Sequence, residues 1–234
     1  MTDVTPARTR LSLAMLRPAG TWEMVLVLGI PIGMSTASAI AWNLRRAGVT
    51  PFTNWNVILS LAIQVVFAAC ILAFLSRRHW RPVAVAGTPE PRDFLRGLGL
   101  WFGLLVGFYL TLLALNIAVP GFVVRALPRP FTVALAPPVI VAAAIIDPIF
   151  EEFFFLGYAI PALGNRFGIR TAFVASVLLR VAAHGYQGRL AIIAILPVAL
   201  VLTGYFVRTG RIWPVVVAHV IQDAIALSVM SGTT

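Results

Sequence analysis

Stretches of about 20 predominantly apolar residues recur along the whole chain and constrain its fold more than any other feature. A transmembrane helix needs roughly 20 such residues to cross the hydrocarbon core of a bilayer. Seven segments suit this length, and they run approximately over 22–42, 55–75, 97–119, 131–163, 171–186, 190–207 and 212–230. The sequence therefore predicts an all-α polytopic membrane bundle with about seven transmembrane helices.

Composition supports the same class. The chain has 234 residues, of which 60% are hydrophobic and only 11% charged, so too little polar surface exists for a soluble enzyme. The net charge of +10 comes from arginines scattered between the apolar segments, which indicates membrane topology and not nucleic-acid binding. Their bias toward one side predicts a cytoplasmic N-terminus. The basic set is entirely arginine, a composition that fits a bacterial plasma-membrane protein.

The domain organisation follows from the position of the first apolar segment. We expect residues 1–20 to form a cytoplasmic tail and residues 21–234 to form a single integral membrane domain. The arginines before residue 18 and the small residues at 37–39 also imitate a cleavable signal peptide. Because the apolar stretch continues to Trp42, we expect it to remain as a span.

Half of the eight acidic residues lie inside predicted spans, together with two histidines and one arginine. A charge in hydrocarbon costs several kcal/mol unless it is paired, bound to a metal or hydrated. The sequence therefore predicts a functional site made from Asp147, Glu151, Glu152, Arg180, His184, His219 and Asp223. Asp147, which precedes Pro148, either extends this acidic site or makes a local hydrogen bond at a proline kink.

The spacing of these residues brings them to similar depths. Arg166 lies in the turn between two predicted spans. Glu151 lies 15 residues before Arg166, and His184 lies 18 residues after Arg166. A helical hairpin would place Glu151 and His184 within about 5 Å of the same depth. His219 and Asp223 are four residues apart and share one helix face.

Two glutamates and two histidines drawn from three helices suit the activation of water. A carboxylate can take a proton from water, and neutral imidazoles can orient that water or bind a divalent metal. Glu151, His184 and His219 would together give a zinc site with an open position. The single-helix zinc motif HExxH is absent.

Three motifs resemble those of the CPBP (CAAX protease and bacteriocin-processing, or Abi) family of intramembrane proteases, which includes the type II CAAX prenyl endopeptidases. The run DPIFEEFFFLG at 147–157 is similar to the family's EExxxR motif. Arg180 and His184 correspond to FxxxH, and His219 and Asp223 to HxxxN or HxxxD. The resemblance covers about 137–227.

The resemblance implies residue roles. Glu151 would be the base that activates water, and Glu152 its acidic partner. His184 and His219 would position the water or bind metal, and Asp223 would support the oxyanion or orient His219. The family is described both with and without a catalytic metal, so zinc stays open.

Two positions depart from the family motifs. Leu156 stands where the family has arginine, and Arg180 stands where it has phenylalanine. We hypothesise one exchange, in which Arg180 supplies from the next helix the guanidinium that keeps Glu152 ionised. The alternative is that the fold is kept and catalysis is lost.

The interpretation is an intramembrane peptidase that hydrolyses a peptide bond at or in the bilayer. Its partners would be membrane lipid and a peptide or membrane-anchored protein substrate. A non-catalytic membrane partner or immunity protein and a proton-coupled transporter are the alternatives. Against the transporter stand the absence of an inverted repeat and the adjacent glutamates matched to two histidines.

Overall fold

The computed structural model describes residues 18–33, 53–78, 80, 86–121, 134–184 and 189–232, with the backbone alone for 189–194. The described residues form seven helical segments. In chain order these are α2 with the π-helical η1 (together Thr21–Gly33), α4 (Asn54–Ser76), α6 (Pro91–Ala118), α8 (Pro137–Glu152) continued by the π-helical η2 (Phe153–Tyr158) and α9 (Ala159–Phe167), α10 (Ile169–Ala183), α11 (Arg189–Thr209) and α12 (Trp213–Gly232).

Local sequence signals set several helix ends. The side chain of Thr53 accepts a hydrogen bond from the Asn56 backbone and caps α4. Glu90 and Asp93 form a capping box at the start of α6, where Pro91 occupies the first turn. Gly168 turns the chain between α9 and α10 with a φ of +84°, a conformation that glycine adopts without steric cost.

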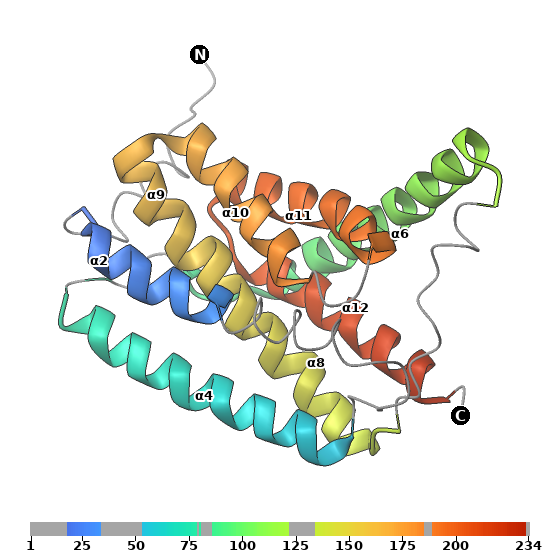
Figure 1. Cartoon of the computed structure of the whole chain (residues 1–234), viewed down its shortest axis with the longest axis horizontal. Helices are drawn as coiled ribbons and strands as arrows, with labels where there is room; N and C mark the ends of the chain where they lie inside the picture. Colours follow the sequence, from blue (N-terminus) through green and yellow to red (C-terminus); the bar gives the residue numbers. More distant parts are fainter. Residues whose placement is uncertain are drawn as a thin grey trace.

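The continuous helix α8–η2–α9 is the centre of the bundle. Figure 1 shows it crossing the molecule, with α4 along one side and α12 along the other. α10 packs against α9 and α11, and α6 packs against α11 and α12 before its C-terminal half extends away from the bundle (Figure 1). Helices that are far apart in the chain therefore meet around the C-terminal half of α8.

The surface of the bundle is apolar and its interior contains charge. Large hydrophobic side chains are exposed along α4, α6 and α12, and these three helices are long and apolar enough to cross a membrane. By contrast, Arg180 heads the largest fully buried side chains among the described residues. A soluble protein has the reverse distribution, so this is the arrangement of an integral membrane protein.

The predicted all-α membrane bundle is confirmed, and each of the seven predicted spans overlaps a helical segment within the described residues. Their bounds differ in places. α6 begins at Pro91 and not near Gly97, because the capping box lies outside the apolar run. The fourth helix ends at Phe167, later than the expected residue 163.

Some of the sequence-based predictions concern residues that the structure does not describe. Residues 1–17 and 34–52 lie outside the described residues, and they hold most of the expected tail, the small residues of the signal-peptide alternative and the end of the first span. The single-domain division, the tail and the N-terminal orientation stay predictions.

Candidate active site

A buried ion pair joins α8 to α10. Arg180 donates from Nη1 to Glu152 Oε1 at 2.7 Å and from Nη2 to Glu152 Oε2 at 2.5 Å. Both residues are buried, with exposed fractions of 1% and 0%. The guanidinium also lies over the ring of Phe155, 5.1 Å from its centre. This two-point contact is the geometry that the proposed exchange between Leu156 and Arg180 requires.

Leu156 itself is fully buried in η2, among apolar core residues. Ser176 of α10 donates to the Phe155 carbonyl oxygen at 2.7 Å and helps hold η2 against α10. π-helical turns inside α-helices are frequent at functional sites. In this turn, the Phe155 carbonyl bonds to the helix that carries Arg180.

His219 completes the hydrogen bonding of Glu152. Its Nδ1 lies 2.7 Å from Glu152 Oε1, which already accepts from Arg180. Since an ionised carboxylate only accepts, Nδ1 is the donor in this contact. His219 Nε2 lies 3.6 Å from Oδ2 of Asp223, one turn later on α12. Glu152 therefore acts as an anchor for both an arginine and an imidazole.

His184, at the end of α10, is also held by a hydrogen bond at Nδ1, in this case to a backbone carbonyl. Its Nδ1 lies 2.9 Å from the carbonyl oxygen of Arg180. Because a carbonyl oxygen can only accept, Nδ1 carries a proton and is the donor in this contact. Arg180 therefore makes two contacts in the site. Its side chain pairs with Glu152, and its backbone carbonyl orients the imidazole of His184, four residues later.

Glu151 differs from its neighbour Glu152. It is half-buried, and its Oε2 is buried with no hydrogen-bond partner within the described parts of the chain. Asp223 lies within electrostatic reach of both Glu151 and His184. The adjacent glutamates are therefore not equivalent, because one is fully bonded and the other presents a buried acceptor.

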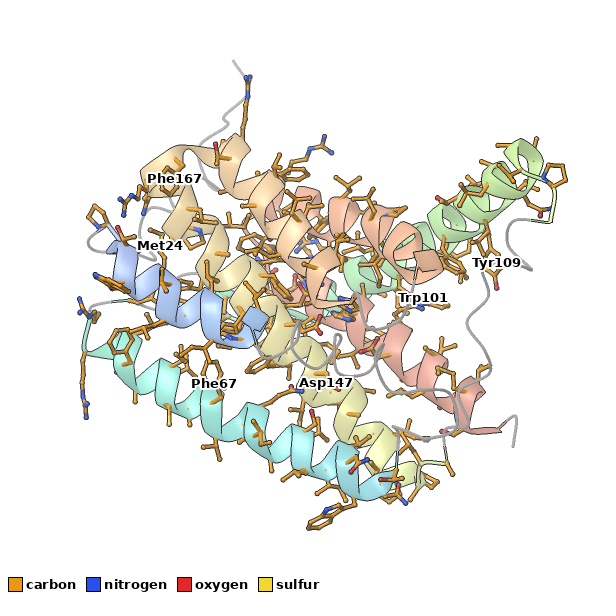
Figure 2. The ribbon with its side chains drawn as sticks, in the orientation of Figure 1. Met24, Phe67, Trp101, Tyr109, Asp147 and Phe167 are labelled. Carbon is orange, nitrogen blue, oxygen red and sulfur yellow. The ribbon has the colours of Figure 1, made fainter. Side chains whose placement is uncertain are left out.

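Asp147 connects the site to α4. The amide Nε2 of Gln64 donates to Asp147 Oδ1 at 2.6 Å, and Figure 2 shows Asp147 on α8. This hydrogen bond reaches another helix and is not the local bond at the proline kink that the sequence also allowed. Sequence reasoning missed Gln64, although a lone glutamine within an apolar span was a usable signal.

Two further polar clusters contain buried acids that were expected to be exposed at helix starts. Glu23 of α2 is buried, accepts from the Tyr158 hydroxyl at 3.1 Å and lies 3.9 Å from Arg78. Asp93 is also buried and accepts from Arg211 Nε at 2.8 Å and Nη2 at 2.6 Å. These contacts with Asp93, and a third with a neighbouring glutamate, raise the pKa of Arg211. The clusters fasten helix ends and are separate from the site.

Both histidines expected to bind metal have one ring nitrogen engaged by another group. Within the described parts of the chain, no group of three or more His, Cys, Asp or Glu side chains is arranged to hold a metal ion. Nδ1 of His219 is engaged by Glu152, and Nδ1 of His184 by a backbone carbonyl. The zinc site formed by Glu151, His184 and His219 stays a prediction, and we assign no step of the reaction to a metal.

The fold is that of a polytopic helical membrane protein, and its interior holds a cluster of carboxylate, guanidinium and imidazole groups. Residues 133–225 match the family model described as type II CAAX prenyl endopeptidase Rce1-like, which confirms the family resemblance. The matched segment covers less than half of the chain but contains Glu151, Glu152, Arg180, His184, His219 and Asp223. Searches of curated proteins and of solved structures found no match.

Proposed function

We propose that this protein is an intramembrane endopeptidase in which Glu151 activates water to hydrolyse a peptide bond at or in the bilayer. The observation that carries the proposal is the contrast between the adjacent glutamates. Glu152 uses both oxygens on Arg180 and His219, whereas Glu151 presents a buried oxygen without a partner within the described residues. The match to a prenyl endopeptidase family model supports the same chemistry.

The roles follow from the hydrogen bonds. Glu151 takes a proton from a water molecule, and the oxygen of that water attacks the substrate carbonyl carbon. His184, with Nδ1 fixed by a carbonyl, directs Nε2 to orient this water. His219, fixed by Glu152, supports the oxyanion that develops on the carbonyl oxygen, and Asp223 helps to orient it.

The Arg180–Glu152 pair supports an active site more than a decayed one. A buried carboxylate that lost its family arginine would be left unpaired, yet here an arginine from another helix meets both oxygens. The substrate would be a lipid-embedded peptide or a membrane-anchored protein, because the site lies within an apolar bundle. A prenylated C-terminal peptide is the first candidate, given the family description.

The test is peptide cleavage by the full chain in nanodiscs. The panel contains prenylated C-terminal peptides, the same peptides without the prenyl group, and peptides anchored by an apolar segment. We expect Glu151→Gln to lower the rate by about 10²-fold to 10⁴-fold, the usual contribution of a general base. Glu90→Gln is the matched control, since its side chain is 44% exposed and outside the site.

The outcomes separate the candidate functions. Loss of cleavage in Glu151→Gln with normal cleavage in Glu90→Gln supports the proposal. Equal rates in both variants would remove Glu151 from the reaction. A folded protein that cleaves no member of the panel would favour the non-catalytic partner. Repeating the assay with chelator, and then with added zinc, tests the metal expectation directly.

A further inference from the structure

The Gln64–Asp147 contact lies beside the proposed base. Asp147 and Glu151 are separated by one helical turn on α8, so both side chains fall on the same face of that helix. The Gln64 amide donates to Oδ1 of Asp147 across the packed α4–α8 interface. Nothing in the family motifs or in the roles assigned above uses this pair.

The charges around Asp147 differ from those around Glu152. The groups within electrostatic reach of Asp147 are Glu151, Asp223 and His219, two acids and one imidazole. Glu152 instead receives a guanidinium on both oxygens. Within the described residues Asp147 is seen bonded only through Oδ1, to Gln64, whereas both oxygens of Glu152 accept from Arg180. Asp147 is therefore a carboxyl group of the site that has an oxygen left to hold and donate a proton.

The hydrogen bond from Gln64 selects which oxygen carries that proton. Since Oδ1 accepts from the Gln64 amide, the proton of a neutral Asp147 resides on Oδ2. The other amide atom, Gln64 Oε1, is buried without a partner in the described part of the chain. Gln64 thus fixes the rotation of the carboxyl group while remaining able to accept one more hydrogen bond.

Peptide hydrolysis requires an acid as well as a base, because an amine anion is a very poor leaving group. Both Glu152 oxygens are already occupied. We propose that Asp147 donates the proton to the leaving amine and that Gln64 is a positioning residue that orients Asp147. This inference rests on the proposed peptidase function and adds an acid to it.

The proton balance closes without any other reactant. The water oxygen bonds to the carbonyl carbon while its proton passes to Glu151. The carbon–nitrogen bond then breaks, and its electron pair stays on nitrogen, which takes the Oδ2 proton of Asp147. Transfer of the Glu151 proton to Asp147 through water restores both groups, one turn apart on the same helix.

The test compares two substrates with the same acyl part. One has a peptide bond, and the other has a p-nitrophenyl ester, whose leaving group departs without a proton. Asp147→Asn keeps the acceptor for Gln64 but carries no transferable proton. We expect it to lower peptide cleavage about 100-fold and to leave ester cleavage within about threefold of the unaltered protein. Glu151→Gln lowers both.

Gln64→Leu supplies the second variant, because it leaves Asp147 intact and remains informative if Asp147→Asn does not fold. It should lower kcat for the peptide about tenfold and spare the ester. Gln222→Leu is the matched control, a glutamine on α12 that accepts from the Trp101 indole at 3.2 Å. It should change neither rate.

The outcomes separate the role of Asp147 and Gln64 from the proposed role of Glu151. Selective loss of peptide cleavage in Asp147→Asn or Gln64→Leu supports the inference. Equal loss on both substrates, or normal peptide cleavage, would overturn it while the role of Glu151 stands. If the unaltered protein hydrolyses neither substrate, or if Glu151→Gln hydrolyses both normally, the proposed function fails and this inference fails with it.

Discussion

Replacing Arg180 with leucine would leave the buried Glu152 carboxylate without its guanidinium. Two hydrogen bonds of 2.7 and 2.5 Å are lost, and His219 remains as the only other group within the described residues that is seen bonded to Glu152. Removing one partner of a buried pair costs about 3–5 kcal/mol, because the other charge stays buried and uncompensated. We expect Arg180→Leu to reduce the free energy of unfolding by that amount and to abolish cleavage.

A double-mutant cycle separates the interaction free energy of the Arg180–Glu152 pair from the cost of lost packing. Glu152→Gln removes the charge from the other side, and the double variant contains neither charge. We expect the double variant to lose far less stability than the two single variants together, with a coupling energy of about 2 kcal/mol or more. Unfolding by SDS in detergent micelles, followed by circular dichroism, measures each free energy.

The same variant tests the proposed exchange of positions. Leu156 lies one turn after Glu152, so Leu156→Arg in the Arg180→Leu background should return a guanidinium to that carboxylate and restore part of the activity. Arg170→Leu is the matched control, because Arg170 begins the same helix and is exposed, so its loss should cost less than about 0.5 kcal/mol. The reasoning is refuted if Arg180→Leu costs no more than this control, or if Leu156→Arg gives no rescue.

Two other contacts give predictions about stability that the same unfolding assay can check. In Gly97→Ala, the added Cβ would lie 2.5 Å from Val217 Cγ1, so α6 and α12 must separate at a cost of about 1–3 kcal/mol. Gly103→Ala on the same helix meets nothing within 4 Å and should not destabilise the protein, because alanine has the higher helix propensity. Similar losses in both variants would contradict the close approach. Arg211→Leu removes the two hydrogen bonds to Asp93 and should cost about 1–3 kcal/mol. An unchanged unfolding curve would show that this clamp contributes no net stability.

The sequence predicted the helices and most of the site because both depend on local spacing. Apolar runs of span length give the helices, and the four-residue spacing of Arg180 and His184 places both on one face of α10. The pairing of Arg180 with Glu152 was also accessible, since two opposite charges at similar depth in an apolar bundle have few other partners.

Contacts between helices far apart in the chain were not predictable in this way. Gln64 meets Asp147 across 83 residues, and no spacing rule relates them. The burial of Glu23 and Asp93 was missed because each lies near a helix start, where an exposed acid is ordinarily favourable. Only the packing of α2 and α6 against the rest of the bundle removes these acids from water.

The hairpin formed by α8, η2, α9 and α10 has a consequence for how the chain enters a membrane. A charged residue such as arginine costs about 2.5–3.5 kcal/mol at the centre of an inserted helix. Inserted one after the other, α8 would carry Glu152 and α10 would carry Arg180 into lipid, each without its counter-ion. The turn at Gly168 holds the two helices together, so the opposite charges can neutralise each other during insertion. The pair that orders the finished site therefore also makes joint entry of its two helices less costly than separate entry.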